Sequence, residues 1–135
     1  MANRKKCLVD TSVLIALFRK NDEAKLALET LTPDYAYVCD ITVLEILAGC
    51  STPEKREYAL NLLETYGLLK NCEHISDNAV RLMKRYCVQR QGQPVLHLAD
   101  CLIAAFALHY KMPLLTFNKK DFDFIQSIEL HSLSR

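Results

Sequence analysis

The segment Cys7-Leu8-Val9-Asp10-Thr11-Ser12-Val13 decides the fold, because an apolar run ends in an acid and the pattern then changes. Residues 6–9 predict a short strand. The Asp10-Thr11-Ser12 turn has side chains that favour the start of a helix, and the apolar residues of 13–19 predict that helix. The chain therefore opens with a strand that passes through a polar turn directly into a helix.

The same alternation continues along the chain. Further strands are expected at 35–39, 68–72 with an extension to 75, 113–116 and 128–131. Further helices are expected at 22–31, at 41–48 ending at Gly49, from Pro53 to Tyr66 closed by Gly67, from Ser76-Asp77 to about Arg90 before Gly92 and Pro94, and at 98–110, with a helical turn at 121–125. Strands alternating with helices predict an α/β fold with a short central parallel sheet flanked by helices. We expect residues 1–135 to form a single domain.

Composition narrows the function classes. The net charge of +1 gives no overall attraction to nucleic acid, so any such affinity must come from local patches. The six cysteines form no CxxC pair and no zinc-binding spacing. Half of the residues are hydrophobic, so the chain can form a core that needs no disulfide framework. No apolar run approaches the roughly 18 residues of a membrane span, and Asp10 breaks the apolar stretch that a signal peptide would need. A cytoplasmic protein is therefore expected.

Three acidic residues stand inside apolar sequence. Asp10 ends the first strand, Glu45 interrupts the helix at 41–48, and Asp100 interrupts the helix at 98–110. Burying an unpaired carboxylate costs several kcal/mol, whereas burying a leucine gains only about 1.5–3 kcal/mol. The common partner for several converging carboxylates is a hard divalent cation. This pattern indicates a metal-dependent enzyme.

The predicted sheet gives a second argument for the same site. Ligands of parallel α/β sheets bind beyond the carboxyl ends of the strands. Asp10 and Asp121 follow strands, and Asp40 and Glu45 follow the strand at 35–39, so the acids fall at one edge. A divalent metal there would polarise a phosphoryl oxygen and lower the pKa of a bound water, which points to a phosphodiester substrate. The chain has neither a GxxxxGK[ST] nor a GxGxxG loop, which argues against nucleoside triphosphates and dinucleotides.

Each acid also has a simpler explanation. Asp10 could cap the helix that follows, Glu45 could reach solvent, and Asp100 could be favoured at a helix start by the macrodipole. His97 is expected at a helix start near the site rather than as a ligand, and His109 at the end of the same helix. Together the acids form a pattern that is more specific than any one of them.

Four segments, in order, resemble the motifs of the PIN-domain family. They are LVDTSVLI at 8–15, TVLEILAG at 42–49, LADCLIAA at 98–105 and LTFNKKDF at 115–122. The match covers nearly the whole chain at about the family's length, and a chain this short is most similar to the VapC toxins of bacterial and archaeal toxin–antitoxin pairs. The resemblance implies a PIN-like fold and an endoribonuclease that depends on Mg²⁺ or Mn²⁺.

The resemblance also implies roles for individual residues. Asp10, Glu45 and Asp100 would form the metal-binding core, with Asp10 and Asp100 as the metal ligands. The four catalytic acids would be Asp10, Glu45, Asp100 and Asp121, and Asp123 is an alternative for the fourth. Thr116 and Asn118 would support the site. Water would attack the scissile phosphate of a structured RNA, with tRNA as one candidate, and leave 5′-phosphate and 3′-hydroxyl ends.

Thr11 and Ser12 have no adjacent base, so we interpret them as residues that orient Asp10 or a metal-bound water rather than as nucleophiles. Asp40, an unusual acid before the second motif, is interpreted as the N-cap of the helix that carries Glu45. The family implies a homodimer and a small antitoxin that covers the site, with an arginine that pairs with the acids bidentately.

Two competing classes fit the sequence less well. An aspartyl phosphatase that used Asp10 as its nucleophile would need a second aspartate where Ser12 stands, and a receiver domain would need an acidic pair before its first turn. An inactive PIN scaffold is not indicated, because all four acids are present.

Overall fold

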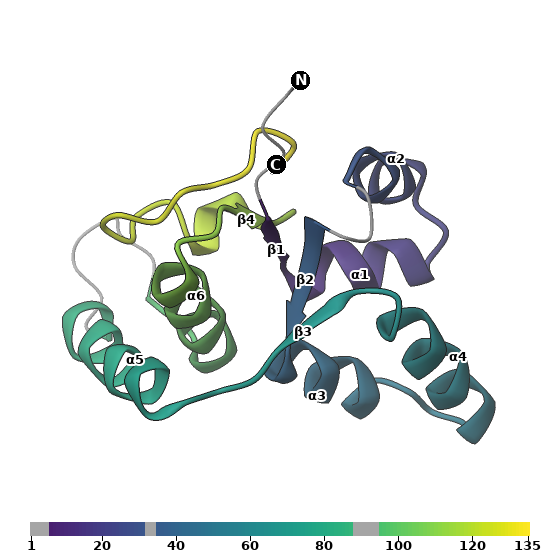
Figure 1. The fold of residues 1–135 in the computed structure, drawn as a ribbon, viewed down its shortest axis with the longest axis horizontal. Coiled ribbons are helices and arrows are strands. Elements are labelled where there is room, and N and C mark those ends of the chain that lie inside the picture. The colour runs from purple at the N-terminus through teal and green to yellow at the C-terminus, as the bar shows by residue number, and fades with distance from the viewer. Residues whose placement is uncertain (1–5, 32–34, 88–94) are drawn as a thin grey trace.

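The structure, a computed structural model, describes residues 6–31, 35–87 and 95–135. Within these ranges a four-stranded parallel sheet has the order β3-β2-β1-β4. The strands are β1 (Cys7–Val9), β2 (Ala36–Cys39), β3 (Gly67–Leu69) and β4 (Leu114–Leu115). The predicted α/β class with a short central parallel sheet is confirmed (Figure 1).

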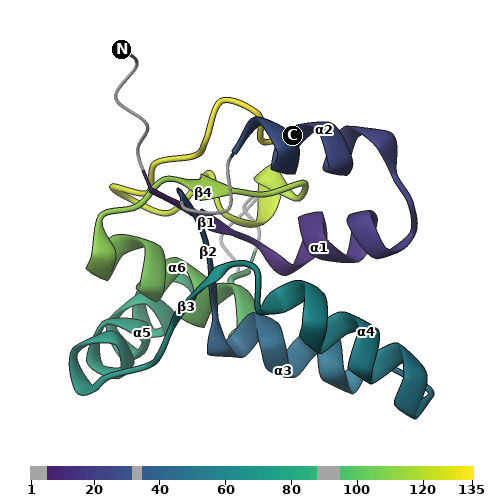
Figure 2. The same cartoon turned by 45° about the vertical axis from the view of Figure 1, so that its right-hand side comes forward.

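Helices cover both faces of this sheet. One side carries α1 (Thr11–Phe18), α2 (Asp22–Thr30), α3 (Asp40–Ala48) and α4 (Pro53–Leu63), and the other carries α5 (Glu73–Tyr86) and α6 (Leu98–Tyr110). Figures 1 and 2 show these two layers with the sheet between them. A short 3₁₀ turn, η2 (Lys119–Asp121), follows β4. In the described part of the chain, no helix is both long and apolar enough to cross a membrane.

The strands are apolar on both faces because both faces are covered. In β1, Cys7 and Val9 pack into the core beneath α1 to α4, whereas Leu8 packs into the core beneath α5 and α6. Leu114 and Leu115 of β4 divide between the two cores in the same way. Successive side chains of a strand point to opposite faces, so a continuous apolar run is needed here rather than an alternating one.

The predicted boundary between β3 and α5 is wrong. β3 ends at Leu69 and α5 begins at Glu73, so the predicted strand extension to Ile75 is helical, and Ser76 and Asp77 lie inside the helix rather than capping it. Ile75 and Ala79 are both buried, at the four-residue spacing of one helix face, and this packing favours the earlier start. The predicted end of the helix near residue 90 lies outside the described residues.

Gly67 was predicted to close a helix, and the structure places it instead as the first residue of β3. The preceding helix, α4, ends at Leu63 rather than Tyr66. Gly67 pairs with Tyr37 of β2, and a Cβ atom on Gly67 would lie 2.4 Å from the Tyr37 ring. A glycine is therefore needed here for a close approach of two strands rather than for a helix end.

The end of the chain also differs in detail from its prediction. The expected strand at 128–131 is a single parallel bridge between Leu114 and Leu130. The helical turn expected at 121–125 starts earlier, as η2 over Lys119–Asp121, and residues 122–124 form a turn that is not helical. All six cysteines are free thiols, and Cys7, Cys39 and Cys101 are buried.

Candidate active site

The structure brings four of the predicted acids to one edge of the sheet. Asp10 lies between β1 and α1, Glu45 lies on α3, Asp100 lies in the first turn of α6, and Asp121 ends η2. Burial raises the pKa of Asp100 to about 7, and the charges of Asp10, Asp121 and, to a smaller extent, Glu45 act in the same direction. The acids therefore lie near enough to repel one another across a shared space.

His97 lies beside this group. It is the N-cap residue of α6, as predicted, and its charge lowers the pKa of Asp100 against the effect of the acids. His109 lies in the last turn of the same helix, also as predicted.

Asp10 is the most enclosed of the acids, with 3% of its surface exposed. Its Oδ2 atom accepts hydrogen bonds from the Ser12 hydroxyl at 2.6 Å and the Thr116 hydroxyl at 2.8 Å. Burial raises the pKa of Asp10, and the bonds from Ser12 and Thr116 oppose this rise. Asp10 occupies the N-cap position of α1, but its side chain makes no capping hydrogen bond. Two side-chain hydroxyls, one of them from the residue after β4, also bind its carboxylate, so Asp10 does more than cap a helix.

The two hydroxyls that hold Asp10 are themselves held by the backbone after β4. The N–H of Phe117 donates to Ser12 Oγ at 3.0 Å, and the N–H of Asn118 donates to Thr116 Oγ1 at 3.0 Å. A hydroxyl carries one proton, so each side chain accepts from the backbone and donates to the carboxylate. Asn118 thus supports the site through its backbone, while its side chain is exposed.

Glu45 is held in a different way, by α1. The Thr11 hydroxyl lies 2.8 Å from Glu45 Oε1 and 3.0 Å from the hydroxyl of Thr42, which is fully buried. Thr11 was predicted to orient Asp10 or a water, and the structure pairs it with Glu45 instead. Thr42 lies one helical turn before Glu45 and was not predicted as a site residue.

The two acids near residue 122 are placed differently. Asp121 is half-buried, and its charge raises the pKa of Asp100. Asp123 is exposed, and its backbone N–H donates to the Lys119 carbonyl at 2.9 Å. The geometry therefore favours Asp121 over Asp123 as the fourth acid.

The prediction that Asp40 is an N-cap is wrong. Cys39 is the N-cap residue of α3, and Asp40 is the first residue of the helix. Asp40 Oδ2 accepts a hydrogen bond from the Asn71 N–H at 3.2 Å. This contact joins α3 to the segment after β3, so the Asp40 carboxylate has a role in the fold.

The acids suit a divalent cation by their chemistry. As they stand in the described ranges, no three His, Cys, Asp or Glu side chains lie close enough to hold a metal directly. Mg²⁺ needs no such cage, because it keeps several waters and takes one or two carboxylates from the protein. A cation would also offset the repulsion that raises the pKa of Asp100. The donor set therefore fits Mg²⁺ or Mn²⁺ bound partly through water.

An apolar groove of about 570 Å³ begins beside Glu45 and runs between α1, α3 and α4. Ile15 and Phe18 line it from α1, and Ile46 and Tyr58 line it from α3 and α4. Phe18 and Tyr58 also make an edge-to-face contact with ring centroids 6.1 Å apart. The groove is therefore mostly apolar, with Glu45 at the site and Arg19, Glu54 and Lys55 also on its lining.

Comparison with known proteins agrees with this fold. The PIN-domain family model matches residues 7–126, and the chain belongs to that family. Within the family it groups with the VapC-type proteins. Ribonuclease VapC of Rickettsia bellii is 31% identical over 127 residues, which are 91% of this chain and 92% of that protein.

Two further similarities cover comparable lengths. Ribonuclease VapC1 of Methanocaldococcus jannaschii is 32% identical over 126 residues, which are 93% of this chain and 85% of that protein. A toxin–antitoxin complex from Klebsiella pneumoniae contains a chain of similar structure, with a TM-score of 0.75 and 29% identity, covering 91% of this chain and 95% of that one.

Proposed function

We propose that this chain is the ribonuclease toxin of a VapBC-type toxin–antitoxin pair and that it cleaves RNA with Mg²⁺ or Mn²⁺. One observation carries the proposal: beside the effect of burial, the charges of three acids from separate elements of a PIN fold, Asp10, Asp121 and Glu45, raise the pKa of Asp100. The names of the two VapC relatives support RNA as the substrate.

Asp10 and Asp100 would hold the metal, and Glu45 and Asp121 would complete the set of acids. When bound, the metal lowers the pKa of a water and neutralises charge on the phosphoryl oxygens. Ser12 and Thr116 fix the Asp10 carboxylate, and Thr11 fixes Glu45 at Oε1. Attack of water on phosphorus, with departure of the 3′ oxygen, gives 5′-phosphate and 3′-hydroxyl ends.

The substrate would approach over the open rim of the site. Lys119 and Lys120 are exposed and come directly before Asp121. Their charges would attract the phosphate backbone to a protein whose net charge is only +1. We propose a structured RNA as the substrate, with tRNA as one candidate.

A small antitoxin is the proposed partner. The Klebsiella pneumoniae neighbour is a toxin–antitoxin complex, and the groove between α1, α3 and α4 combines apolar side chains such as Ile15 and Phe18 with charged ones that include Glu45. An antitoxin segment with apolar side chains and an arginine directed at the acids would fit this combination.

We also propose a homodimer. Leu44 and Leu98 are large apolar side chains left 62% and 72% exposed beside Glu45 and Asp100. Contiguous exposed apolar patches mark surfaces where proteins associate, and we propose that these two side chains belong to one. Light scattering on the purified protein measures the oligomeric state.

The test is cleavage of labelled RNA by the purified protein. We expect cleavage with Mg²⁺ or Mn²⁺, none with EDTA, and none with the Asp100→Asn variant. Mapping RNA ends after brief induction in cells identifies the target. The proposal fails if the parent cuts no RNA with either metal and if Asp10→Asn and Asp100→Asn behave like the parent in cells.

A further inference from the structure

The last residues of the chain run along the edge of β4 that β1 leaves open. The Leu114 N–H donates to the Glu129 carbonyl at 2.8 Å, and the His131 N–H donates to the Leu114 carbonyl at 2.8 Å. These bonds form the parallel bridge between Leu114 and Leu130. The segment 129–135 therefore covers the edge of the sheet next to Asp10 and its partner Thr116.

Beyond β4, this segment satisfies both backbone groups of Thr116. The Thr116 N–H donates to Ser134 Oγ at 3.1 Å, and the Arg135 N–H donates to the Thr116 carbonyl at 2.9 Å. Ser134 Oγ also donates to the Leu114 carbonyl at 3.0 Å, and the Lys119 N–H donates to the Arg135 carbonyl at 3.1 Å. Residues 134 and 135 thus continue the pairing where the strand itself has ended.

Thr116 connects this segment to the site. Its backbone is fixed by Ser134 and Arg135, while its hydroxyl donates to Asp10 Oδ2 at 2.8 Å. Thr116 is fully buried and Ser134 is 8% exposed, so water has little access to replace a lost bond. The direction of the Thr116 hydroxyl therefore depends on both residues that hold its backbone.

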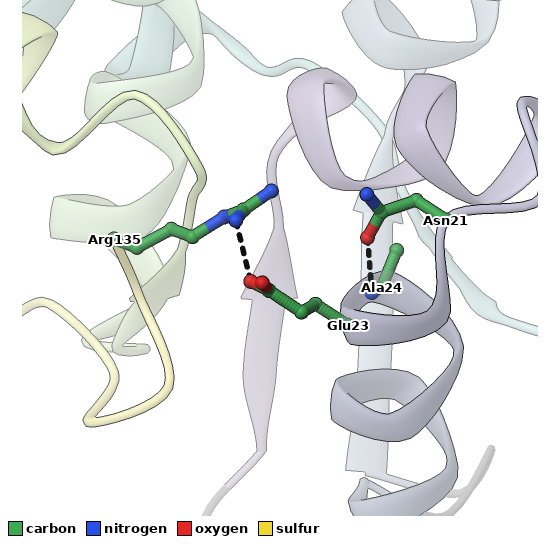
Figure 3. Close-up of polar contacts among 4 residues, drawn as sticks. All are labelled: Asn21, Glu23, Ala24 and Arg135. Atoms are coloured by element: carbon green, nitrogen blue, oxygen red, sulfur yellow. Dashed lines mark hydrogen bonds and ion pairs between the residues drawn. The ribbon is translucent and has the colours of Figure 1, made fainter.

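The side chain of Arg135 holds the next residue. Its guanidinium lies 4.3 Å from the centre of the Phe117 ring, and the Phe117 N–H is the group that donates to Ser12. Arg135 also forms an ion pair with Glu23 of α2 (Figure 3). The Asn21 side chain caps the start of α2 by accepting from the Ala24 N–H at 3.0 Å, which fixes the turn that carries Glu23. Both partners of the ion pair are well exposed, so the ion pair adds little, and the ring contact is the link between the Arg135 side chain and Phe117.

We propose that Ser134 and Arg135 are positioning residues that aim the Asp10 carboxylate, Ser134 through Thr116 and Arg135 through Phe117 and Ser12. The effect of these residues on catalysis rests on the proposed nuclease function. Neither residue touches the acids directly, so the expected effect is misplacement of Asp10 in a folded protein.

The first experiment uses the full chain with Ser134→Ala, and Ser132→Ala serves as the matched control because Ser132 is an exposed serine of the same segment. We expect Ser134→Ala to lower kcat for RNA cleavage about tenfold, with KM for RNA unchanged, and to raise the Mn²⁺ concentration for half-maximal activity by a similar factor. Ser132→Ala leaves all three values unchanged. Ser134→Thr, which keeps the hydroxyl, restores most of the activity.

A double variant separates positioning from simple loss of stability. If Ser134 acts through Thr116, then Ser134→Ala has no further effect on kcat in a Thr116→Val background. If the two effects multiply, or if Ser134→Ala loses activity only in proportion to unfolded protein, the proposal is wrong. The exposed Arg135 gives a variant that should not perturb folding: Arg135→Ala lowers kcat about threefold, whereas Glu23→Gln has no effect.

Thermal unfolding with Mn²⁺ and without RNA tests the positioning role independently of the proposed nuclease function. Mn²⁺ should raise the Tm of the parent and of Ser132→Ala, and should raise the Tm of Ser134→Ala less. If the parent cuts no RNA but shows this difference, the nuclease function fails and the positioning role stands. If Mn²⁺ shifts the Tm of the parent and Ser134→Ala equally, the positioning role fails.

Discussion

The two halves of the site hold their acids in opposite ways. In the half built on β1 and β4, Asp10 is 3% exposed and accepts two hydroxyl bonds, and backbone N–H groups fix both donors. In the half built on helices, Glu45 is exposed and accepts one bond from Thr11. The sheet half is rigid before any ligand arrives, whereas the helix half leaves room for metal, water and substrate to complete it.

Electrostatics joins the halves at Asp100. Its pKa of about 7 results first from burial and then from the charge of Asp10 in the sheet half. The carboxylates of the two halves therefore repel one another, and a divalent cation would reduce this repulsion. This comparison predicts that changes in the sheet half affect activity more than equivalent changes in the helix half.

The largest effect is expected from Asp10→Asn, which removes the charge at the centre of the rigid half. RNA cleavage should fall below detection, while the Tm of the metal-free protein stays the same or rises, because the change relieves carboxylate crowding. Cleavage of labelled RNA and thermal unfolding measure the two quantities. A variant that keeps more than about a tenth of the parental rate would show that Asp10 is not a metal ligand.

Thr116→Val comes next, because it removes one of the two hydroxyls on Asp10 and keeps the side-chain volume. We expect kcat to fall about tenfold to a hundredfold. Thr116→Ser is the matched control and should keep most of the activity. Parental kcat in Thr116→Val would mean that the Ser12 bond at 2.6 Å is sufficient to hold the carboxylate.

The pH dependence of stability tests the electrostatic link between the halves. Because the pKa of Asp100 is raised, the folded state binds this proton more tightly than the unfolded chain. Its contribution is complete below the unfolded pKa of about 4 and is lost as the pH rises through about 7. Without metal, Asp100→Asn should therefore gain stability over the parent between pH 5 and pH 8, by about 1–2 kcal/mol after allowance for partial exposure.

Urea unfolding of the parent and Asp100→Asn in EDTA, at several pH values, measures this difference. If the difference in unfolding free energy between Asp100→Asn and the parent stays constant from pH 5 to pH 8, the pKa of Asp100 is not raised in the folded protein. Adding Mn²⁺ should reverse the order at pH 8, because the parent alone then gains the metal's binding energy.

The smallest effect is expected from Thr11→Val in the helix half. Glu45 loses its single hydroxyl donor but remains on α3 and free to reach a ligand, so kcat should fall only about threefold. Steady-state cleavage kinetics beside Thr116→Val give the comparison directly. If Thr11→Val proves more damaging than Thr116→Val, then the helix half, and not the sheet half, determines the geometry of the site.

Much of the site could be predicted from the sequence because its signals are local. Asp10 comes directly after a buried strand, and Asp100 lies inside an apolar helix. Both acids stand out in the sequence because their neighbours are apolar. The rule that ligands bind beyond the carboxyl ends of strands placed Asp10, Glu45 and Asp121 at one edge, and the family resemblance added Asp100 to them. The order of strands and helices followed from the same local patterns, although the start of α5 and the role of Gly67 did not.

The partners of the acids could be predicted only in part. Ser12 was expected to orient Asp10 or a metal-bound water, and the family resemblance implied Thr116 as a supporting residue, but the pairing of Thr11 with Glu45 and the role of Ser134 were not predicted. Thr116 lies 106 residues from Asp10, and Ser134 contacts Thr116 from the far end of the sequence. Thr11 is next to Asp10 in sequence but bonds Glu45 on another helix. No local pattern pairs Thr11 with Glu45 or Ser134 with Thr116, because a hydrogen bond depends on distances that only packing sets.

The sequence by itself determined an α/β fold with helices on both faces of a parallel sheet and a set of acids at one edge. Hydrophobic periodicity and the cost of burying charge act over a few residues, so they are visible in the chain. The tertiary structure alone decided that Thr11 holds Glu45, why Gly67 must lack a side chain, and how residues 134 and 135 support Thr116. Those contacts arise only when segments far apart in sequence are brought within hydrogen-bond distance.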